Sequence, residues 1–325
     1  MKLKTLLFLL TLVTVLSLAA CQSAEPPAEE AVVEAADFEG SWDLVETYGE
    51  RTGSSWLEVV KEGDGWTGRF LHRGGHAMPA EISINGGVLK ATMLPDDPEA
   101  DWSERTPPTL TATLEDGRLV GNGTSWRDST FTFTGERAPD RLEGSDREVE
   151  WGEPIELFNG EDLTGWETIG NRESHWKAEN GEMVSTESGA NIRTVDEFRD
   201  FKLHIEFKIP EKSNSGIYLR GRYETQVADN YGMEPFSRGV GGIYGYLTPS
   251  VMAAKPAGEW NTVEATLIGY RVTIVVNGET TIDGELIPGI TGGAIDPHEA
   301  EPGPIMLQGD HGPVSYRNIV LTPAN

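Results

Sequence analysis

Strict alternation of apolar and polar residues is the feature that most limits the fold of this chain. In FKLHIEFKI, residues 201–209, the odd positions are apolar, while the even positions carry Lys, His and Glu. Successive side chains of a β-strand point to opposite faces of a sheet, so the pattern predicts a half-buried antiparallel strand. Short β-type runs recur along the chain, and few long helical patterns occur. The chain is therefore predicted to be all-β.

Glycine-centred turns divide these runs into hairpins. INGG (Ile84 to Gly87), EDGR (Glu115 to Arg118) and the pair Asn277 and Gly278 each stand between β-type segments. Glycine and asparagine accept the positive φ that tight hairpins require, so these positions predict two-residue turns.

Residues 37–138 are predicted to form a small antiparallel β domain, an up-and-down barrel or half-barrel. Its opening Phe38, Gly40 and Trp42 resemble the G-x-W start of lipocalin-like barrels, a motif of only three residues. A ligand cavity would follow from that likeness by analogy alone. We favour the interpretation of a structural or spacer domain whose tryptophans fill the core.

The N-terminus is typical of an export signal. Lys2 and Lys4 precede an apolar run that ends in LAAC, and Cys21 is the only cysteine of the chain. LAAC resembles the lipobox of bacterial lipoproteins, in which the cysteine becomes lipidated. We therefore expect residues 1–20 to be a signal peptide, with Cys21 as the membrane anchor and residues 21–36 as a disordered tether.

The same resemblance implies an exported protein on the periplasmic face or the cell surface. Gln22, rather than Asp, follows the cysteine and implies outer-membrane retention if the organism has two membranes. The formal net charge of −27 makes nucleic acid and anionic lipid surfaces poor partners.

Residues 139–153, PDRLEGSDREVEWGE, are polar and without periodicity, and are predicted to link the first domain to a second one over residues 154–325. Across residues 155–322 eight motifs fall in order: LFNGEDLTGW, SNSGIYLRG, YETQVAD, GGIYG, KPAGEWN, VNG, GPIMLQGDHG and YRNI. Together they closely resemble the DUF1080 family, also called the 3-keto-disaccharide hydrolase family. The resemblance implies a concanavalin-like β-sandwich of jelly-roll type.

The resemblance further implies a hydrolase acting on sugars that are already oxidised at carbon 3. The proton on carbon 2 is then acidic, so its removal can expel the aglycone from carbon 1, and water addition completes a net hydrolysis. The oxidised carbohydrate substrate implies a sugar 3-dehydrogenase as functional partner. The alternative, from another class, is a non-catalytic glycan-binding surface lipoprotein.

The candidate site lies in IYLRGRYETQV. If this run is one regular strand, one face carries a polar row: Tyr218, Arg220, Arg222, Glu224 and Gln226. Exposed cross-strand ion pairs would explain such a row equally well on the pattern alone, and the resemblance favours a sugar site. Glu224 is the candidate base or acid, and Arg220 the group that polarises the ketone oxygen. Tyr218, Arg222 and Gln226 are assigned to substrate binding.

Further candidates lie in three other motifs. His311, in QGDHG, is a candidate proton carrier, and which of Glu224 and His311 is the base stays open. Gln308 in the same motif, Tyr244 in GGIYG and Lys255 in KPAGEWN are assigned to substrate binding.

The sequence identifies no certain cofactor, and a divalent metal is the one candidate. Acidic oxygen ligands could hold calcium or manganese, and the candidates are Asp229, Asp296 and Glu299. No fixed ligand spacing supports such a site, and an acidic surface loop is the default interpretation.

Overall fold

The computed structural model describes residues 33–96, 106–126 and 129–325. The predicted signal peptide, Cys21 and residues 21–32 of the predicted tether lie outside the described residues. Within the described ranges, no helix combines the length and the apolar character needed to cross a membrane. A 3₁₀ helix, η1 (Ala35–Phe38), precedes the first strand and buries Phe38.

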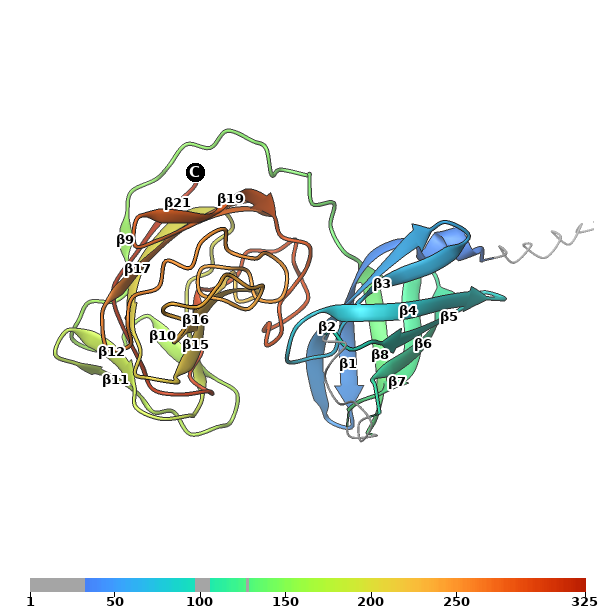
Figure 1. Ribbon diagram of the computed structural model, residues 1–325, viewed down its shortest axis with the longest axis horizontal. Coiled ribbons are helices and arrows are strands. Elements are labelled where there is room, and N and C mark those ends of the chain that lie inside the picture. Colours follow the sequence, from blue (N-terminus) through green and yellow to red (C-terminus); the bar gives the residue numbers. More distant parts are fainter. Residues whose placement is uncertain (1–32, 97–105, 127–128) are drawn as a thin grey trace, which may run out of the picture. The chain divides into compact units, whose positions relative to one another are not determined.

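Eight antiparallel strands close into a barrel in chain order, with β1 pairing with β8 (Figure 1). The turns at Gly86–Gly87 and Asp116–Gly117 have positive φ at both residues, as predicted. The barrel interior is filled by apolar side chains that include Trp42 and Leu44. The strands are β1 (Gly40–Tyr48), β2 (Arg51–Glu62), β3 (Gly65–Leu71), β4 (Met78–Asn85), β5 (Val88–Met93), β6 (Thr109–Glu115), β7 (Arg118–Thr124) and β8 (Thr130–Arg137).

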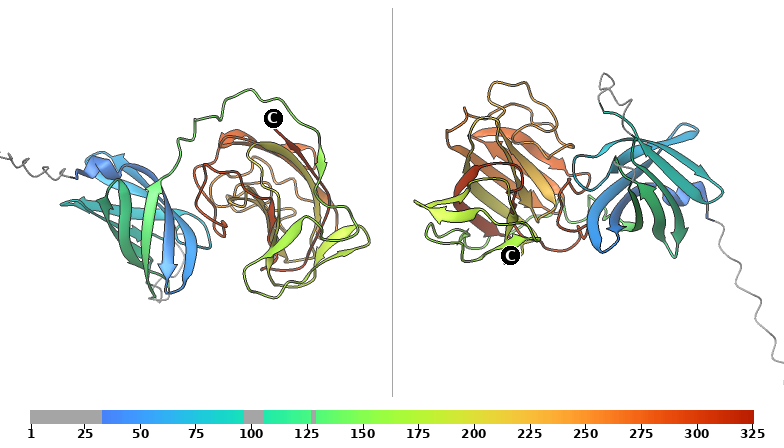
Figure 2. Two further views of the ribbon diagram at one scale, coloured as in Figure 1. Left: turned by 180° about the vertical axis from the view of Figure 1, so that it is seen from behind. Right: turned by 90° about the horizontal axis from the view of Figure 1, so that it is seen from below.

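Two antiparallel sheets form the C-terminal β-sandwich (Figures 1 and 2). One sheet has the order β10-β13-β20-β15-β16, and the other the order β11-β12-β21-β14-β17-β18-β19, with β9 paired to β21. The strands are β9 (Ile155–Glu156), β10 (Trp166–Ile169), β11 (Trp176–Glu179), β12 (Glu182–Ser185), β13 (Asn191–Thr194), β14 (Phe201–Lys208), β15 (Asn214–Leu219), β16 (Tyr223–Ala228), β17 (Asn261–Ile268), β18 (Arg271–Val276), β19 (Glu279–Leu286), β20 (Met306–Leu307) and β21 (Val314–Pro323).

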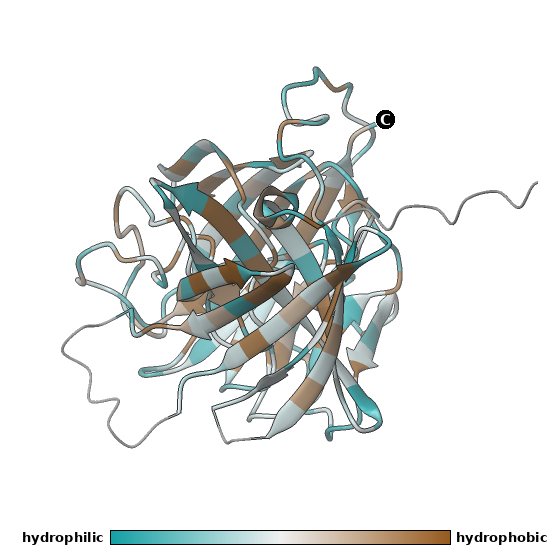
Figure 3. Cartoon of the chain, turned by 90° about the vertical axis from the view of Figure 1, so that its right-hand side faces the viewer, coloured by the Kyte–Doolittle hydropathy of each residue, from teal (hydrophilic) through white to brown (hydrophobic). Residues whose placement is uncertain are grey.

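The core of the sandwich lies between its two sheets. β14 follows the predicted alternation, with Phe201, Leu203, Ile205 and Phe207 buried. Ile217 of the five-stranded sheet belongs to the same core. Apolar and polar bands likewise alternate along the barrel strands that face the viewer in Figure 3, which is the expected appearance of strands with one core face. The predicted fold class, an all-β chain with a barrel followed by a sandwich, is confirmed.

Residues 139–153 contain no strand but pack closely on the C-terminal domain. Ser145 is buried, donates to the Arg141 carbonyl at 2.6 Å and accepts from the Tyr270 backbone N–H at 2.8 Å. Trp151 forms a β-bridge with Ala324. The segment lacks periodicity because its polar side chains and backbone, rather than an apolar face, make these contacts.

Candidate functional site

The hairpin β15–β16 defines the candidate site. Its register places Tyr218 opposite Glu224 and Gly216 opposite Gln226. Because side chains alternate across a sheet, these residues share one face, while Ile217 and the other residues of its face enter the sandwich core. Glu224 and Gln226 therefore lie together, as the alternation predicts, on the face that points away from the core.

The predicted polar row does not extend through the arginines, and this part of the prediction is wrong. Arg220, Gly221 and Arg222 form the three-residue turn between Leu219 and Tyr223, and the first two have φ of 52° and 65°. The run from Ile217 is thus two strands and a turn, rather than one regular strand. The turn directs Arg220 and Arg222 to other parts of the domain.

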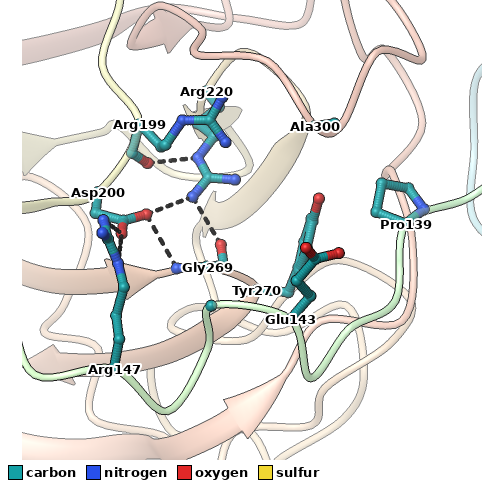
Figure 4. A pocket seen from close by; sticks show the side chains of 10 residues that line it. Pro139, Glu143, Arg147, Arg199, Asp200, Arg220, Gly269, Tyr270 and Ala300 are labelled. Carbon is teal, nitrogen blue, oxygen red and sulfur yellow. Dashed lines mark hydrogen bonds and ion pairs between the residues drawn. The ribbon is translucent and has the colours of Figure 1, made fainter.

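Arg220 lies in a network at the turn end of the hairpin (Figure 4). Its Nε donates to the Arg199 carbonyl at 2.5 Å, and its second guanidinium nitrogen donates to Asp200 at 2.8 Å and to the Gly269 carbonyl at 2.7 Å. Arg147 also donates to the Asp200 carboxylate. Arg220 is 1% exposed and fixes the turn, so we no longer assign it to the ketone oxygen.

Arg222 is likewise held by neighbouring loops. It donates to Asp296 at 2.7 Å and to the Glu301 carbonyl at 3.0 Å. With these partners the guanidinium is committed to the loop of residues 296–302, and it does not face Glu224. The substrate-binding assignment of Arg222 is therefore withdrawn.

Glu224 is a buried carboxyl group, 4% exposed. Burial raises its pKa to about 8, while the Tyr218 hydroxyl and the charge of His311 act to lower the pKa, and the Asp310 charge acts to raise it. The removal of a carboxylate from water disfavours its charged form, and this accounts for the direction. Glu224 is therefore able to exchange a proton near neutral pH.

The Tyr218 hydroxyl is the direct partner of this carboxyl group. It lies 3.0 Å from Oε2 of Glu224 and 2.8 Å from the Gly292 carbonyl. A hydroxyl has one proton, so it donates to only one of the two at a time. Protonated Glu224 can donate to Tyr218 while Tyr218 donates to Gly292, and ionised Glu224 can instead accept the Tyr218 proton. The pair thus accommodates both protonation states of Glu224.

Two buried amide groups flank Glu224. Gln226 and Gln308 are 5% and 8% exposed, and the Oε1 atom of neither accepts a hydrogen bond from a described residue. The Nε2 atom of Gln308 lies 3.5 Å from the Tyr218 hydroxyl. A buried amide oxygen without a partner is costly, and a ligand hydroxyl would satisfy it.

His311 and Asp310 form a pair whose charges act on Glu224. Nδ1 of His311 donates to Asp310 at 2.7 Å, and about half of the imidazole is exposed. The Asp310 hydrogen bond raises the pKa of His311 above its usual value, although partial burial opposes this. Arg172 lies 3.7 Å from the same carboxylate. His311 is therefore a proton donor oriented by Asp310.

The other predicted binding residues have different surroundings. Tyr244 is half-buried beside Glu224: its backbone N–H donates to the Glu224 carbonyl at 2.9 Å, and burial followed by the Glu224 charge raises the pKa of its hydroxyl. Lys255 is exposed and donates to the Trp260 carbonyl at 3.0 Å. Tyr244 thus adjoins the site, whereas Lys255 stabilises its own loop.

Residues 153–322, just over half of the chain, match the family described as 3-keto-alpha-glucoside-1,2-lyase-like domain. The chain belongs to this family. The resemblance found in the sequence is confirmed, and the C-terminal domain is a hydrolase-like domain related to carbohydrates.

Among solved structures, the domain is similar to a candidate glycosyl hydrolase from Parabacteroides distasonis (28% identity over 57% of this chain and 92% of that one, TM-score 0.45). A second candidate glycosyl hydrolase of this organism has 25% identity over 52% of this chain and 98% of its own, with a TM-score of 0.41. The β-glucanase of Bacillus licheniformis has 13% identity over 55% of this chain and 100% of its own, with a TM-score of 0.35. At these TM-scores the likenesses do not bear on activity. No curated protein matches the chain.

The candidate metal ligands of this 3-keto-alpha-glucoside-1,2-lyase-like domain are engaged elsewhere. Asp229 accepts the Lys212 backbone N–H at 2.9 Å, Asp296 pairs with Arg222, and buried Glu299 pairs with Arg141. In the part of the chain that the structure describes, no three His, Cys, Asp or Glu side chains are grouped so that they could hold a metal ion.

Three residues outside the predicted set also shape the site: Thr291, Gly292 and Gly216. Thr291 Oγ1 accepts the Glu224 backbone N–H at 2.9 Å, and Gly292 supplies the carbonyl beside Tyr218. Gly216 leaves the space that the Glu224 side chain occupies. Of these, only Gly216 had a signal, because it lies in SNSGIYLRG at the position that alternates with Tyr218.

Proposed function

We propose that the C-terminal domain cleaves 3-keto-glycosides by elimination, followed by water addition. The observation that carries the proposal is the buried Glu224 carboxyl group, whose pKa of about 8 suits proton transfer near neutral pH. Membership of the 3-keto-alpha-glucoside-1,2-lyase-like family supports the substrate class.

The reaction needs a base, an acid and a donor to the ketone oxygen. The Glu224 carboxylate removes the proton from carbon 2, and the electron pair moves toward the carbon 3 ketone. The enolate then collapses, a double bond forms between carbons 1 and 2, and the bond from carbon 1 to the glycosidic oxygen breaks. His311, held as a proton donor by Asp310 at 2.7 Å, protonates the leaving oxygen. Water adds across the double bond to give the free 3-keto sugar.

The enolate oxygen requires a hydrogen-bond donor. Arg220 does not serve, because its guanidinium is bonded to Arg199, Asp200 and Gly269. Three groups lie beside Glu224. The Tyr218 hydroxyl and the Gln226 amide share its sheet face, and the Gln308 amide lies next to the Tyr218 hydroxyl. Their buried position strengthens a hydrogen bond to a developing negative charge. We assign these three groups to substrate positioning and enolate stabilisation.

A comparison of an oxidised and a plain substrate tests the activity. The full chain is incubated with a 3-keto-disaccharide and, in parallel, with the same disaccharide before oxidation. We expect sugar release from the keto form alone, and a slower rate when carbon 2 carries deuterium. Release from the plain disaccharide at an equal rate would contradict the proposed substrate class. Full retention of the deuterium in the product, with an unchanged rate, would exclude the elimination.

A glycan-binding protein without catalysis is the second candidate. The unpartnered amide oxygens of Gln226 and Gln308 favour it, because they would accept sugar hydroxyls whether or not the sugar is oxidised. Binding of both disaccharides by calorimetry, with no product from either one, would support this function and contradict the enzymatic one.

We also propose that the chain is an exported lipoprotein anchored at Cys21, with a sugar 3-dehydrogenase in the same cell supplying its substrate. The support is the LAAC motif after the basic and apolar start of the sequence. Incorporation of labelled palmitate into the wild-type chain, but not into the Cys21→Ser variant, is the expected result. Equal labelling of both proteins would contradict the anchor.

A further inference from the structure

The inward-facing row of β1 changes from apolar to polar toward the end of the strand. Trp42 and Leu44 belong to the barrel core, whereas the next residues of the same row are Glu46 and Tyr48. Glu46 is fully buried, with 0% exposure. A carboxyl group inside a barrel costs more free energy than an apolar side chain that fills the same space, so the fold itself does not account for it.

Glu46 is the centre of a hydrogen-bonded triad with His72 and Tyr48. Nδ1 of His72 donates to Oε1 of Glu46 at 3.1 Å, and the Tyr48 hydroxyl donates to Oε2 at 3.0 Å. Nε2 of His72 lies 3.4 Å from the same hydroxyl, and the imidazole stacks on Phe131 with 5.3 Å between ring centroids. The triad therefore holds Tyr48 and His72 in fixed positions at this end of the barrel.

A cavity of about 580 Å³ opens next to the triad, with Tyr48, Arg51, His72 and Arg73 in its wall. This volume falls within the range of sites for small molecules, and barrel ends are a common place for such sites. Tyr48 and His72 thus bond to the buried Glu46 carboxylate and also line the cavity.

Two arginines give the cavity a positive charge. Neither Arg51 nor Arg73 forms an ion pair with a described residue, in a chain of 53 acidic and 26 basic residues. The Arg73 guanidinium lies over the Tyr48 ring, 4.7 Å from its centroid. Gly53 makes room for it, because a β-carbon there would be 2.8 Å from Nε of Arg73. Arginine binds carboxylate and phosphate groups through paired hydrogen bonds.

We propose that this end of the barrel binds a small ligand with an anionic group, a carboxylate or a phosphate. Arg51 and Arg73 hold the anionic group, and Tyr48 and His72, fixed by Glu46, contact the rest of the ligand. The barrel then has a binding function of its own, in place of the spacer role expected from the sequence.

Calorimetry on the full chain at low salt tests the proposal with three sugars of similar size that differ in their anionic group: glucuronate, glucose 6-phosphate and glucose. We expect saturable binding of at least one anionic sugar with a Kd on the order of 1 mM or below, and no detectable binding of glucose at this end. The anion that binds identifies which of the two groups the site accepts.

Three variants locate the binding. Arg51→Gln and Arg73→Gln should each raise the Kd for the anionic sugar at least about tenfold, because each removes a charged hydrogen-bond donor. Arg118→Gln, which removes an exposed arginine of the same barrel paired with Glu136, should leave the Kd within about twofold. Absence of binding for both anionic sugars, or equal loss in Arg118→Gln, would overturn the proposal. Thermal unfolding of each variant confirms that the barrel is folded.

Discussion

The side chain of Glu224 occupies the space in which a side chain of residue 216 would stand. A β-carbon built on Gly216 would lie 2.8 Å from Cγ and 2.9 Å from Cδ of Glu224, and closer still to its Oε1. Gly216 is opposite Gln226 in the hairpin register, two pairs from Tyr218 and Glu224 and on the same face. The absence of a side chain at one position thus sets the placement of the carboxyl group at another.

Gly216→Ala should therefore lower activity on a 3-keto-disaccharide at least about 100-fold, because Glu224 is buried and has no room to shift without leaving its partners. The backbone at 216 is not in the left-handed region, so alanine adds no backbone strain there and acts only through its contact with Glu224. Gly65→Ala is the control, since its β-carbon would meet nothing nearer than 3.7 Å. Equal activity of the two variants would show that the placement of Glu224 is not needed.

The pH dependence separates a base from an acid role for Glu224. A 3-keto nitrophenyl glycoside needs no protonation of its leaving group, so His311 is not required and only the base limits the rate. If Glu224 is the base it must be ionised, and kcat/KM should rise with pH through about 8 and then level off. If Glu224 is instead the acid, the rate with this substrate should not change through about pH 8, whereas the rate with a disaccharide should fall. His311→Gln should slow a disaccharide but spare the nitrophenyl substrate.

The sequence predicted the strands better than the turn that joins them. β14 could be recognised because alternation alone defines a strand with one core face, and the turns with Asn-Gly or Asp-Gly could be recognised from their need for positive φ. The turn at Arg220 and Gly221 was missed because arginine rarely adopts positive φ, and RGR continued the polar alternation of its neighbours.

The site was predictable only where its residues lie in one strand or motif. Glu224, Gln226 and Tyr218 share a hairpin face, so alternation placed them together. Thr291 and Gly292 come from a distant loop, and their contacts depend on tertiary structure. In the barrel, Glu46 of β1 and His72, which follows β3, lie far apart in sequence and belong to no common motif. Only the folded barrel brings them together.

Glu224→Gln should change the pH dependence of stability. The folded-state pKa of Glu224 is about 8, above the ordinary carboxyl value of 4.5 that holds in the unfolded chain. The folded protein binds this proton more tightly, so its stabilising effect is complete below pH 4.5 and is lost as pH rises through about 8. Between pH 4.5 and about pH 8 the unfolding free energy of the wild type should fall by a few kcal/mol, at about 1.4 kcal/mol per pKa unit. The unfolding free energy of the Gln variant should fall by less.

Urea unfolding at pH 5 and pH 9 measures this difference. The gap in unfolding free energy between wild type and Glu224→Gln should grow in favour of the variant at pH 9. A gap that stays constant across the range would mean that Glu224 keeps an ordinary pKa in the folded state. The same variant should retain less than about 1% of the activity on a 3-keto-disaccharide, since an amide does not accept the proton.

Arg220→Met tests the corrected role of this arginine. The substitution removes one donor from the buried Asp200 carboxylate and the donor to the Arg199 and Gly269 carbonyls, so we expect a loss of about 3–5 kcal/mol in unfolding free energy. Arg118→Gln, which breaks an exposed pair, should change it by less than about 0.5 kcal/mol. The kcat per folded molecule of Arg220→Met should stay within about threefold of wild type, because Arg220 does not face Glu224. Unchanged stability together with lost kcat would return Arg220 to the catalytic site.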